Sequence, residues 1–230
     1  MRLQRVRPGS WWFDVALVAA FGLLTLLLAA KTPLLRVDAA VRDFADAHRP
    51  SGLYWTLRVF NYLGQGGQVL TPLAAIVAFV RAVRGRTVRP FLPVVAAFVL
   101  TYLTIGPLKL WTDRAAASSH IQHPEWLFHD PTGLSYPSGH VVNAIVWYGV
   151  LAYLLRGILS ERQRLAVRYG APAIVLLTTT YLSFHWITDG LAAILLGLFL
   201  DRILRRIPWD DIPLGKLARR REQSHVQAAA

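Results

Sequence analysis

The sequence contains no cysteine among its 230 residues. This absence excludes a disulfide framework, a thiolate metal site and a cysteine nucleophile, so any catalysis must use other side chains. Charged residues are also scarce, because they make up 17% of the chain, and the mean hydropathy is +0.39. An ordinary soluble domain has about 25% charged residues. We therefore predict a membrane protein.

Acidic residues are the scarcer of the two charge types, with 13 Asp and Glu against 25 Lys and Arg. A net charge of +12 would suit a nucleic-acid-binding protein, but that function needs the basic residues on one folded surface. Here they are scattered between apolar runs, as in the cytoplasmic loops of membrane proteins. We therefore expect no nucleic-acid partner.

Six apolar runs are each near the length of about 20 residues that crosses the hydrocarbon core of a bilayer. They are residues 13–30, 67–82, 90–111, 138–155, 165–184 and 187–204. The first follows the basic stretch MRLQRVR, so a cleaved signal peptide is an alternative there. The second begins within NYLGQGGQVL, so a re-entrant loop is an alternative. The runs predict an all-α bundle of six transmembrane helices, with residues 1–230 forming a single integral membrane domain.

The basic residues also orient this predicted bundle. If the N-terminus is cytoplasmic, 18 of the 25 Lys and Arg residues fall on the cytoplasmic side. We therefore predict a multi-pass plasma-membrane protein with cytoplasmic tails at residues 1–10 and 208–230. In residues 33–48 the apolar positions are spaced by three and four, which predicts an amphipathic helix on the outer surface. The alternative is a helix that packs on its neighbours without a functional role.

Ionisable residues near the later runs gather at one predicted membrane depth, on the outer side. They are Lys109, Asp113, Arg114, His140, His185 and Asp189. Two cations, two histidines and two carboxylates at helix ends favour a single site. A transporter more often carries such groups near the bilayer midplane.

The stretch LSYPSGH stands at the start of the fourth run. Pro137 and Ser138 can begin a helix with Ser138 as its N-cap, which leaves the amides of Gly139 and His140 as unpaired donors. Such a helix end attracts anions, and glycine lets them approach closely. By itself Pro-Ser-Gly is more typical of a plain helix cap. His140 favours catalysis, because it can give a proton to a leaving group.

The stretch FHWITD places His185 and Asp189 four residues apart, on one face if the segment is helical. A carboxylate there can accept a hydrogen bond from one ring nitrogen and leave the other as a nucleophile. A structural hydrogen bond is the alternative for one such pair. The second histidine and Lys109 on the same side favour catalysis.

These residues resemble the type 2 phosphatidic acid phosphatases, the lipid phosphate phosphatase superfamily related to vanadium haloperoxidases. That family carries the blocks K-x6-R-P, P-S-G-H and S-R-x5-H-x3-D. The sequence has Lys109, then PSGH at 137–140, then His185 and Asp189, in this order and within residues 67–204. The resemblance implies a phosphatase-like core over this range.

The resemblance also implies roles for the residues. His185 would attack phosphorus to form a phosphohistidine, Asp189 would orient it, and His140 would protonate the departing alcohol. The phosphate oxygens would be held by Lys109, Ser138 and the amide of Gly139. The implied activity is an extracytoplasmic, metal-independent lipid phosphate phosphatase that needs no cofactor. Its partners would be a phosphorylated membrane lipid and the bilayer.

The sequence departs from the family at two arginines. Ala116 stands seven residues after Lys109, and Thr179 stands six residues before His185. Each charge-assisted hydrogen bond lost in this way is worth about 1.5–3 kcal/mol. Arg114 is a candidate replacement in phosphate binding, and the alternative is an interfacial arginine that reaches lipid head groups.

Two other functions stay open at this point. The missing arginines favour a non-catalytic relative that binds phosphorylated lipid, whereas a lipid-to-lipid phosphotransferase would use the same His185 and exclude water. The outer loop also carries His120, His123 and His129, whose spacing fits a zinc motif poorly, so we predict no metal site. The sequence indicates neither a particular lipid phosphate nor an oligomeric state.

Overall fold

The computed structural model describes residues 8–214 of the chain. The regular elements among these residues are helices. The α-helices are α1 (Trp11–Ala29), α2 (Leu34–Ala47), α3 (Ser51–Asn61), α4 (Thr71–Gly85), α5 (Phe91–Thr112), α6 (Gly139–Leu154), α7 (Glu161–Leu165), α8 (Ala171–Tyr181) and α9 (Ile187–Arg206). The other elements are a 3-10 turn, η1 (Tyr62–Gly64), and two π-helical turns, η2 (Gly66–Leu70) and η3 (Ala166–Gly170).

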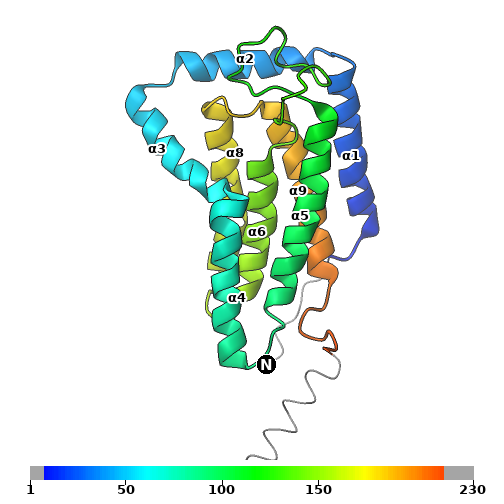
Figure 1. Cartoon of the computed structure of the whole chain (residues 1–230), viewed down its shortest axis with the longest axis vertical. Coiled ribbons are helices and arrows are strands. Elements are labelled where there is room, and N and C mark those ends of the chain that lie inside the picture. Colours follow the sequence, from blue (N-terminus) through cyan, green and yellow to red (C-terminus); the bar gives the residue numbers. More distant parts are fainter. Residues whose placement is uncertain (1–7, 215–230) are drawn as a thin grey trace, which may run out of the picture.

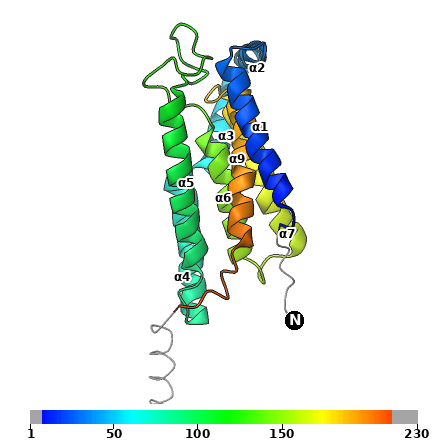
Figure 2. The same cartoon turned by 90° about the vertical axis from the view of Figure 1, so that its right-hand side faces the viewer.

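The long helices form a bundle with α6 at its centre (Figure 1). Helix α6 packs against α4, α5, α8 and α9, and twelve of its sixteen residues are buried. Helix α2 lies across one end of the bundle, and α3 descends obliquely from it (Figures 1 and 2). Burial on all sides explains why α6 is apolar around its whole circumference.

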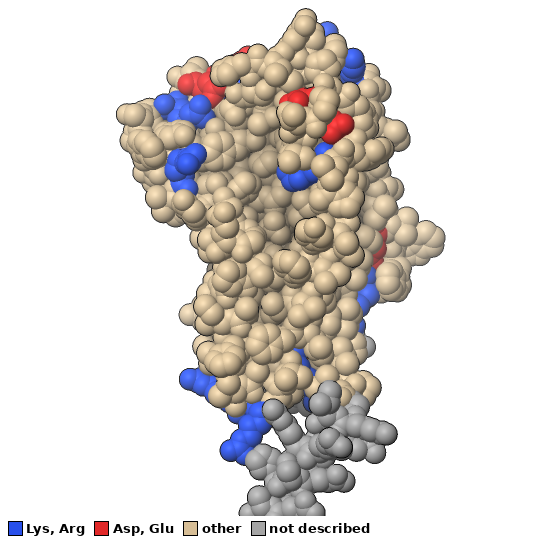
Figure 3. Space-filling view, viewed as in Figure 1, with Lys and Arg blue, Asp and Glu red and all other residues tan. Residues whose placement is uncertain are grey.

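The outer surface of the bundle is apolar. Among the described residues, α1, the continuous helix 66–85 and α5 are long and apolar enough to cross a membrane, and α6 is apolar but shorter. Large side chains such as Phe79, Tyr102 and Leu103 are exposed on this surface. The middle of the face in Figure 3 is largely free of charged side chains. The predicted all-α membrane protein is confirmed, and the number of six spanning helices stays a prediction.

The second predicted run is helical in the structure. The π-turn η2 leads directly into α4, so that one helix covers residues 66–85 and runs along the bundle (Figure 1). π-helical turns are rare in proteins, and those that occur often lie at functional sites. The re-entrant alternative for this segment is therefore not what the structure shows.

Helix α2 forms where the periodicity predicts it, but it buries a different face. Its buried residues are Leu35, Asp38 and Ala45, whereas Val37 and Phe44 of the apolar stripe are exposed. An apolar stripe of this kind suits a lipid interface. The face turned to the bundle carries a carboxylate instead.

The end of the bundle away from α2 is held together by ion pairs. Asp14 of α1 pairs with Arg202, at 2.6 Å, and with Arg206 of α9. Arg156 pairs with Asp210 at 2.7 Å, in the segment that follows α9. Residues 8–10 and 208–214 of the predicted tails are described, and the remainder of both tails lies outside the described residues. Helix α1 begins and α9 ends at this end (Figure 1).

Candidate active site

The predicted site residues meet at the end of the bundle beneath α2. Lys109 lies in the last turn of α5, His140 in the first turn of α6, and His185 two residues before α9. The alternating direction of the helices brings these three chain positions to one end of the molecule (Figure 1). Residues up to 76 positions apart in the sequence therefore form one cluster, because Lys109 and His185 both belong to it.

The two histidines face each other in this cluster. Nδ1 of His140 lies 3.4 Å from Nε2 of His185, and the ring centroids are 5.6 Å apart with an angle of 67° between the planes. His185 is 7% exposed and His140 is partly exposed. Both rings can therefore reach one small group bound beside them, as a nucleophile and a proton donor do.

A serine links His185 to the carboxylate of Asp189. Nδ1 of His185 lies 3.5 Å from Oδ2 of Asp189, which is long for a hydrogen bond, but only 3.1 Å from Oγ of Ser135. The Ser135 hydroxyl donates to Oδ2 of Asp189 at 2.5 Å. The predicted support of His185 by Asp189 therefore runs mainly through Ser135. With its proton on Nδ1, His185 keeps a lone pair on Nε2.

The electrostatic surroundings favour the neutral form of His185. Burial lowers the pKa of His185, against the opposite influence of the Asp189 carboxylate. A lowered pKa leaves the imidazole unprotonated at neutral pH, and an unprotonated ring nitrogen is what a nucleophile requires.

The first turn of α6 combines a helix N-terminus with a cation. Ser138 is the N-cap, and its Oγ accepts a hydrogen bond from the amide of Val141. A side chain at Gly139 would lie 3.4 Å from Cε of Lys109, so the lysine passes directly over this residue. The Lys109 ammonium also donates to the carbonyl of Leu134. A helix N-terminus beside an ammonium group is a site suited to an anion.

Arg114 has a role other than the two predicted for it. Its side chain is 0% exposed, so it does not reach head groups at the interface. Nη2 pairs with Asp38 at 2.6 Å and Nη1 with Asp189 at 2.5 Å. Nη1 also donates to Thr188, and Nε donates to the carbonyl of Glu125. Because every nitrogen already has a protein partner, the expectation that Arg114 binds phosphate is corrected.

The two positions where the family has arginine carry no charge. Thr179 is fully buried and its hydroxyl donates to the carbonyl of Val175 at 2.8 Å. Ala116 lies in the loop after α5. Arg114 is engaged with carboxylates, whereas Lys109 lies beside the N-terminus of α6.

Sequence reasoning missed five polar residues around this cluster. They are Asp38, Asn61, Gln65, Ser135 and Thr188. Ser135 lies within the stretch that contains PSGH, and Gln65 within the glycine-rich NYLGQGGQVL, so a local signal existed for both. Asp38 gave none, because a charged residue on an amphipathic helix normally faces water.

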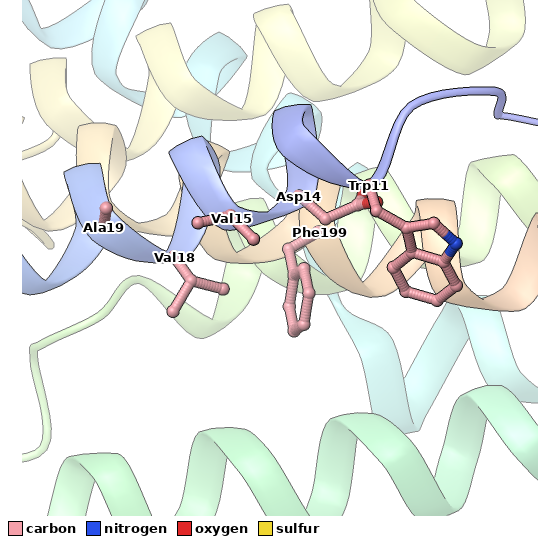
Figure 4. Close-up of a pocket in the computed structure, with 6 residues that line it drawn as sticks. All are labelled: Trp11, Asp14, Val15, Val18, Ala19 and Phe199. Carbon is pink, nitrogen blue, oxygen red and sulfur yellow. The ribbon is translucent and has the colours of Figure 1, made fainter.

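Other features of the surface lie outside this cluster. A groove between α1 and α9 is lined mainly by apolar side chains, and its one charged residue, Asp14, is already paired with arginines (Figure 4). In the outer loop His123 stacks on Trp126, and His129 contacts the carbonyl of Gln122 at 2.8 Å. Within residues 8–214, no group of three or more His, Asp or Glu is placed to hold a metal ion.

Comparison with known proteins gives one family and one structure. The family model of the PAP2 superfamily matches residues 90–213. A search of curated proteins finds no significant match. The fold is similar to the crystal structure of a transmembrane PAP2-type phosphatidylglycerolphosphate phosphatase from Bacillus subtilis, with a TM-score of 0.73 and 23% identity over 88% of this chain and 99% of that chain.

Proposed function

Because this chain belongs to the PAP2 superfamily, we propose that it is a phosphatase that removes phosphate from a phosphorylated membrane lipid. The observation that carries the proposal is the pair of imidazole nitrogens of His140 and His185, 3.4 Å apart beside Lys109 and the N-terminus of α6. A site that only binds phosphate needs neither a nucleophile nor an acid.

In the first step, Nε2 of His185 attacks phosphorus and the bond from phosphorus to the lipid alcohol breaks. His140 gives its Nδ1 proton to the departing oxygen, so the lipid leaves as a neutral alcohol. Ser135 accepts from Nδ1–H of His185 and donates to Asp189, whose negative charge stabilises the positive charge of the ring. Lys109 holds the phosphate oxygens together with the first amides of α6.

In the second step, water attacks the phosphohistidine and gives a proton to His140, which releases inorganic phosphate. The protein residues supply all the proton transfers of this scheme, so the proposed activity is independent of metal and cofactor. We place the site on the outer face of the plasma membrane with both termini in the cytoplasm, as the distribution of basic residues favours.

The phosphohistidine gives a direct test. Wild-type protein mixed with radiolabelled lipid phosphate should form a labelled species that is stable to base and labile to acid, in the presence of EDTA. His185→Ala should form no labelled species and release no phosphate from a panel of lipid phosphates in detergent. Undiminished release by His185→Ala would contradict the assignment of the nucleophile.

The two alternatives have different products. Ala116 and Thr179 favour a lipid-binding protein without turnover, because both family arginines are replaced. A phosphotransferase would pass the phosphoryl group from His185 to a second lipid. The wild-type products distinguish the three: free phosphate for the phosphatase, none for the binding protein, and a newly phosphorylated lipid for the transferase.

A further inference from the structure

The glycine-rich segment 61–66 lies beside the first turn of α6, and its polar residues reach the site. We propose that Asn61 and Gln65 are positioning residues for His140. They hold its Nε2 atom, so that Nδ1 is the ring nitrogen that exchanges protons with the substrate. This inference rests on the phosphatase function proposed above and extends it to a segment outside the three family blocks.

The two ring nitrogens of His140 have separate sets of neighbours. Nε2 of His140 lies 3.2 Å from the amide nitrogen Nε2 of Gln65 and 3.5 Å from the amide nitrogen Nδ2 of Asn61. Nδ1 lies 3.4 Å from Nε2 of His185, where the phosphoryl group must arrive. Amides therefore face one nitrogen, and the nucleophile faces the other.

Side-chain amides suit a histidine that gains and loses a proton. An imidazolium carries hydrogen on both nitrogens, so Nε2–H needs an acceptor while Nδ1–H gives its proton to the leaving oxygen. A half-turn of a terminal amide exchanges its oxygen and its nitrogen at one place. Asn61 and Gln65 can thus pair with Nε2 as acceptors or as donors.

The side-chain oxygen of Asn61 is available as an acceptor for the protonated ring of His140. Asn61 is 7% exposed, and its Oδ1 is buried without a hydrogen-bond partner within the part of the chain that the structure describes. Buried polar atoms are rarely left unpaired, because each costs free energy. After a half-turn of the Asn61 amide, Oδ1 would take the place of Nδ2 and accept from Nε2–H of His140. Asn61 can thus satisfy the protonated form of His140 that the first step requires.

The glycines of the segment allow this contact. A Cβ atom on Gly64 would lie 2.9 Å from Cβ of His140, and one on Gly66 would lie 2.4 Å from Cγ of Asn143. Both residues therefore touch α6 at a separation that excludes any side chain. By contrast, a Cβ atom added to Gly67 would have no other atom within 4 Å. The close approach is what brings the amides of Asn61 and Gln65 to His140.

The test compares two phosphate esters that differ in their need for an acid. Dodecyl phosphate has an alcohol leaving group that must be protonated, whereas the nitrophenolate of 4-nitrophenyl phosphate leaves without a proton. Gln65→Met and Asn61→Leu, singly and combined, keep the side-chain size and remove the amide. We expect the double variant to lose at least about tenfold in kcat/KM on dodecyl phosphate and less than about threefold in kcat/KM on 4-nitrophenyl phosphate, because this ratio reports the steps up to the phosphohistidine.

The matched control is Gln68→Met, an exposed glutamine of the adjoining π-turn η2. It should keep both rates. Adding Gln65→Met to His140→Ala should cause no further loss on either ester, because the amide acts through the missing ring. Equal losses on both esters, or a further loss without His140, would overturn the inference while leaving His185-dependent turnover intact. Wild-type protein that hydrolyses neither ester nor any lipid phosphate would overturn the proposed function itself.

Discussion

Arg114 serves the site from a position that substrate does not reach. Its guanidinium joins Asp38 of α2 to Asp189, and Asp189 supports His185 through Ser135. A charge with 0% exposure persists only when carboxylates and carbonyls satisfy it, as they do here. A buried arginine thus holds the Asp189 carboxylate and couples it to α2.

Replacing Arg114 should therefore affect stability and activity together. Arg114→Ala leaves two buried carboxylates without their cation, and breaking a buried pair in this way costs about 3–5 kcal/mol. Arg114→Lys should restore only part of this, because an ammonium group cannot bridge both carboxylates in the same geometry. Unfolding in detergent and phosphate release measure the two effects. Arg84→Ala, an exposed arginine on α4, is the control, and equal stability of the Arg114 and Arg84 variants would refute the role.

The burial of His185 has a consequence for pH dependence. Because burial lowers its pKa, the nucleophile stays neutral as the pH falls past the ordinary histidine value of about 6.5. The rate on 4-nitrophenyl phosphate, which needs no proton donor, should therefore hold steady from about pH 7.5 to about pH 6. A decline centred on about pH 6.5 would show an unperturbed histidine as the nucleophile.

Among the elements, α2 and the segment before α4 contribute residues to the site that lie outside the three family blocks. Helix α2 closes the end of the bundle and provides Asp38, which accepts from the hydroxyl of Thr188 at 2.6 Å. The turn η1 and the π-turn η2 follow the surface of α6, with Gly64 and Gly66 at the contact. The site depends on how closely these elements pack.

A pair of adjacent glycines tests this packing. Gly66→Ala places a methyl group 2.4 Å from the Asn143 side chain, so either η2 or that side chain must shift, at a cost of about 1–3 kcal/mol. We expect weaker turnover of lipid phosphates and a lower unfolding temperature. Gly67→Ala has open space around it and should be neutral in both measurements. The same effect from both substitutions would mean that backbone freedom, and not close contact, explains the glycines.

On the scale of the whole molecule, the site and the beginning of α1 lie at opposite ends of the bundle (Figure 1). The ion pairs of Asp14 with Arg202 and Arg206 join α1 to α9 at the end away from the site. An apolar middle separates the two ends, as a membrane protein requires. Orientation therefore decides which leaflet supplies the substrate.

The absence of cysteine makes this orientation easy to measure. Ser118 is exposed in the loop after α5, and Glu161 is exposed at the start of α7. In intact cells, a membrane-impermeant maleimide should label Ser118→Cys and leave Glu161→Cys unlabelled until the membrane is permeabilised. The reverse pattern would place the site on the cytoplasmic face.

The sequence by itself determined the all-α membrane class and the approximate helix positions, and it singled out His140, His185 and Asp189 as candidate site residues. Apolar run length and motif spacing are local properties, so they can be read without coordinates. The rotation of each helix about its axis is set by packing instead. Only the tertiary structure decided that α2 turns Asp38 inward, that Arg114 binds carboxylates, and that Gln65 reaches His140, because each of these contacts joins elements whose relative position no local pattern encodes.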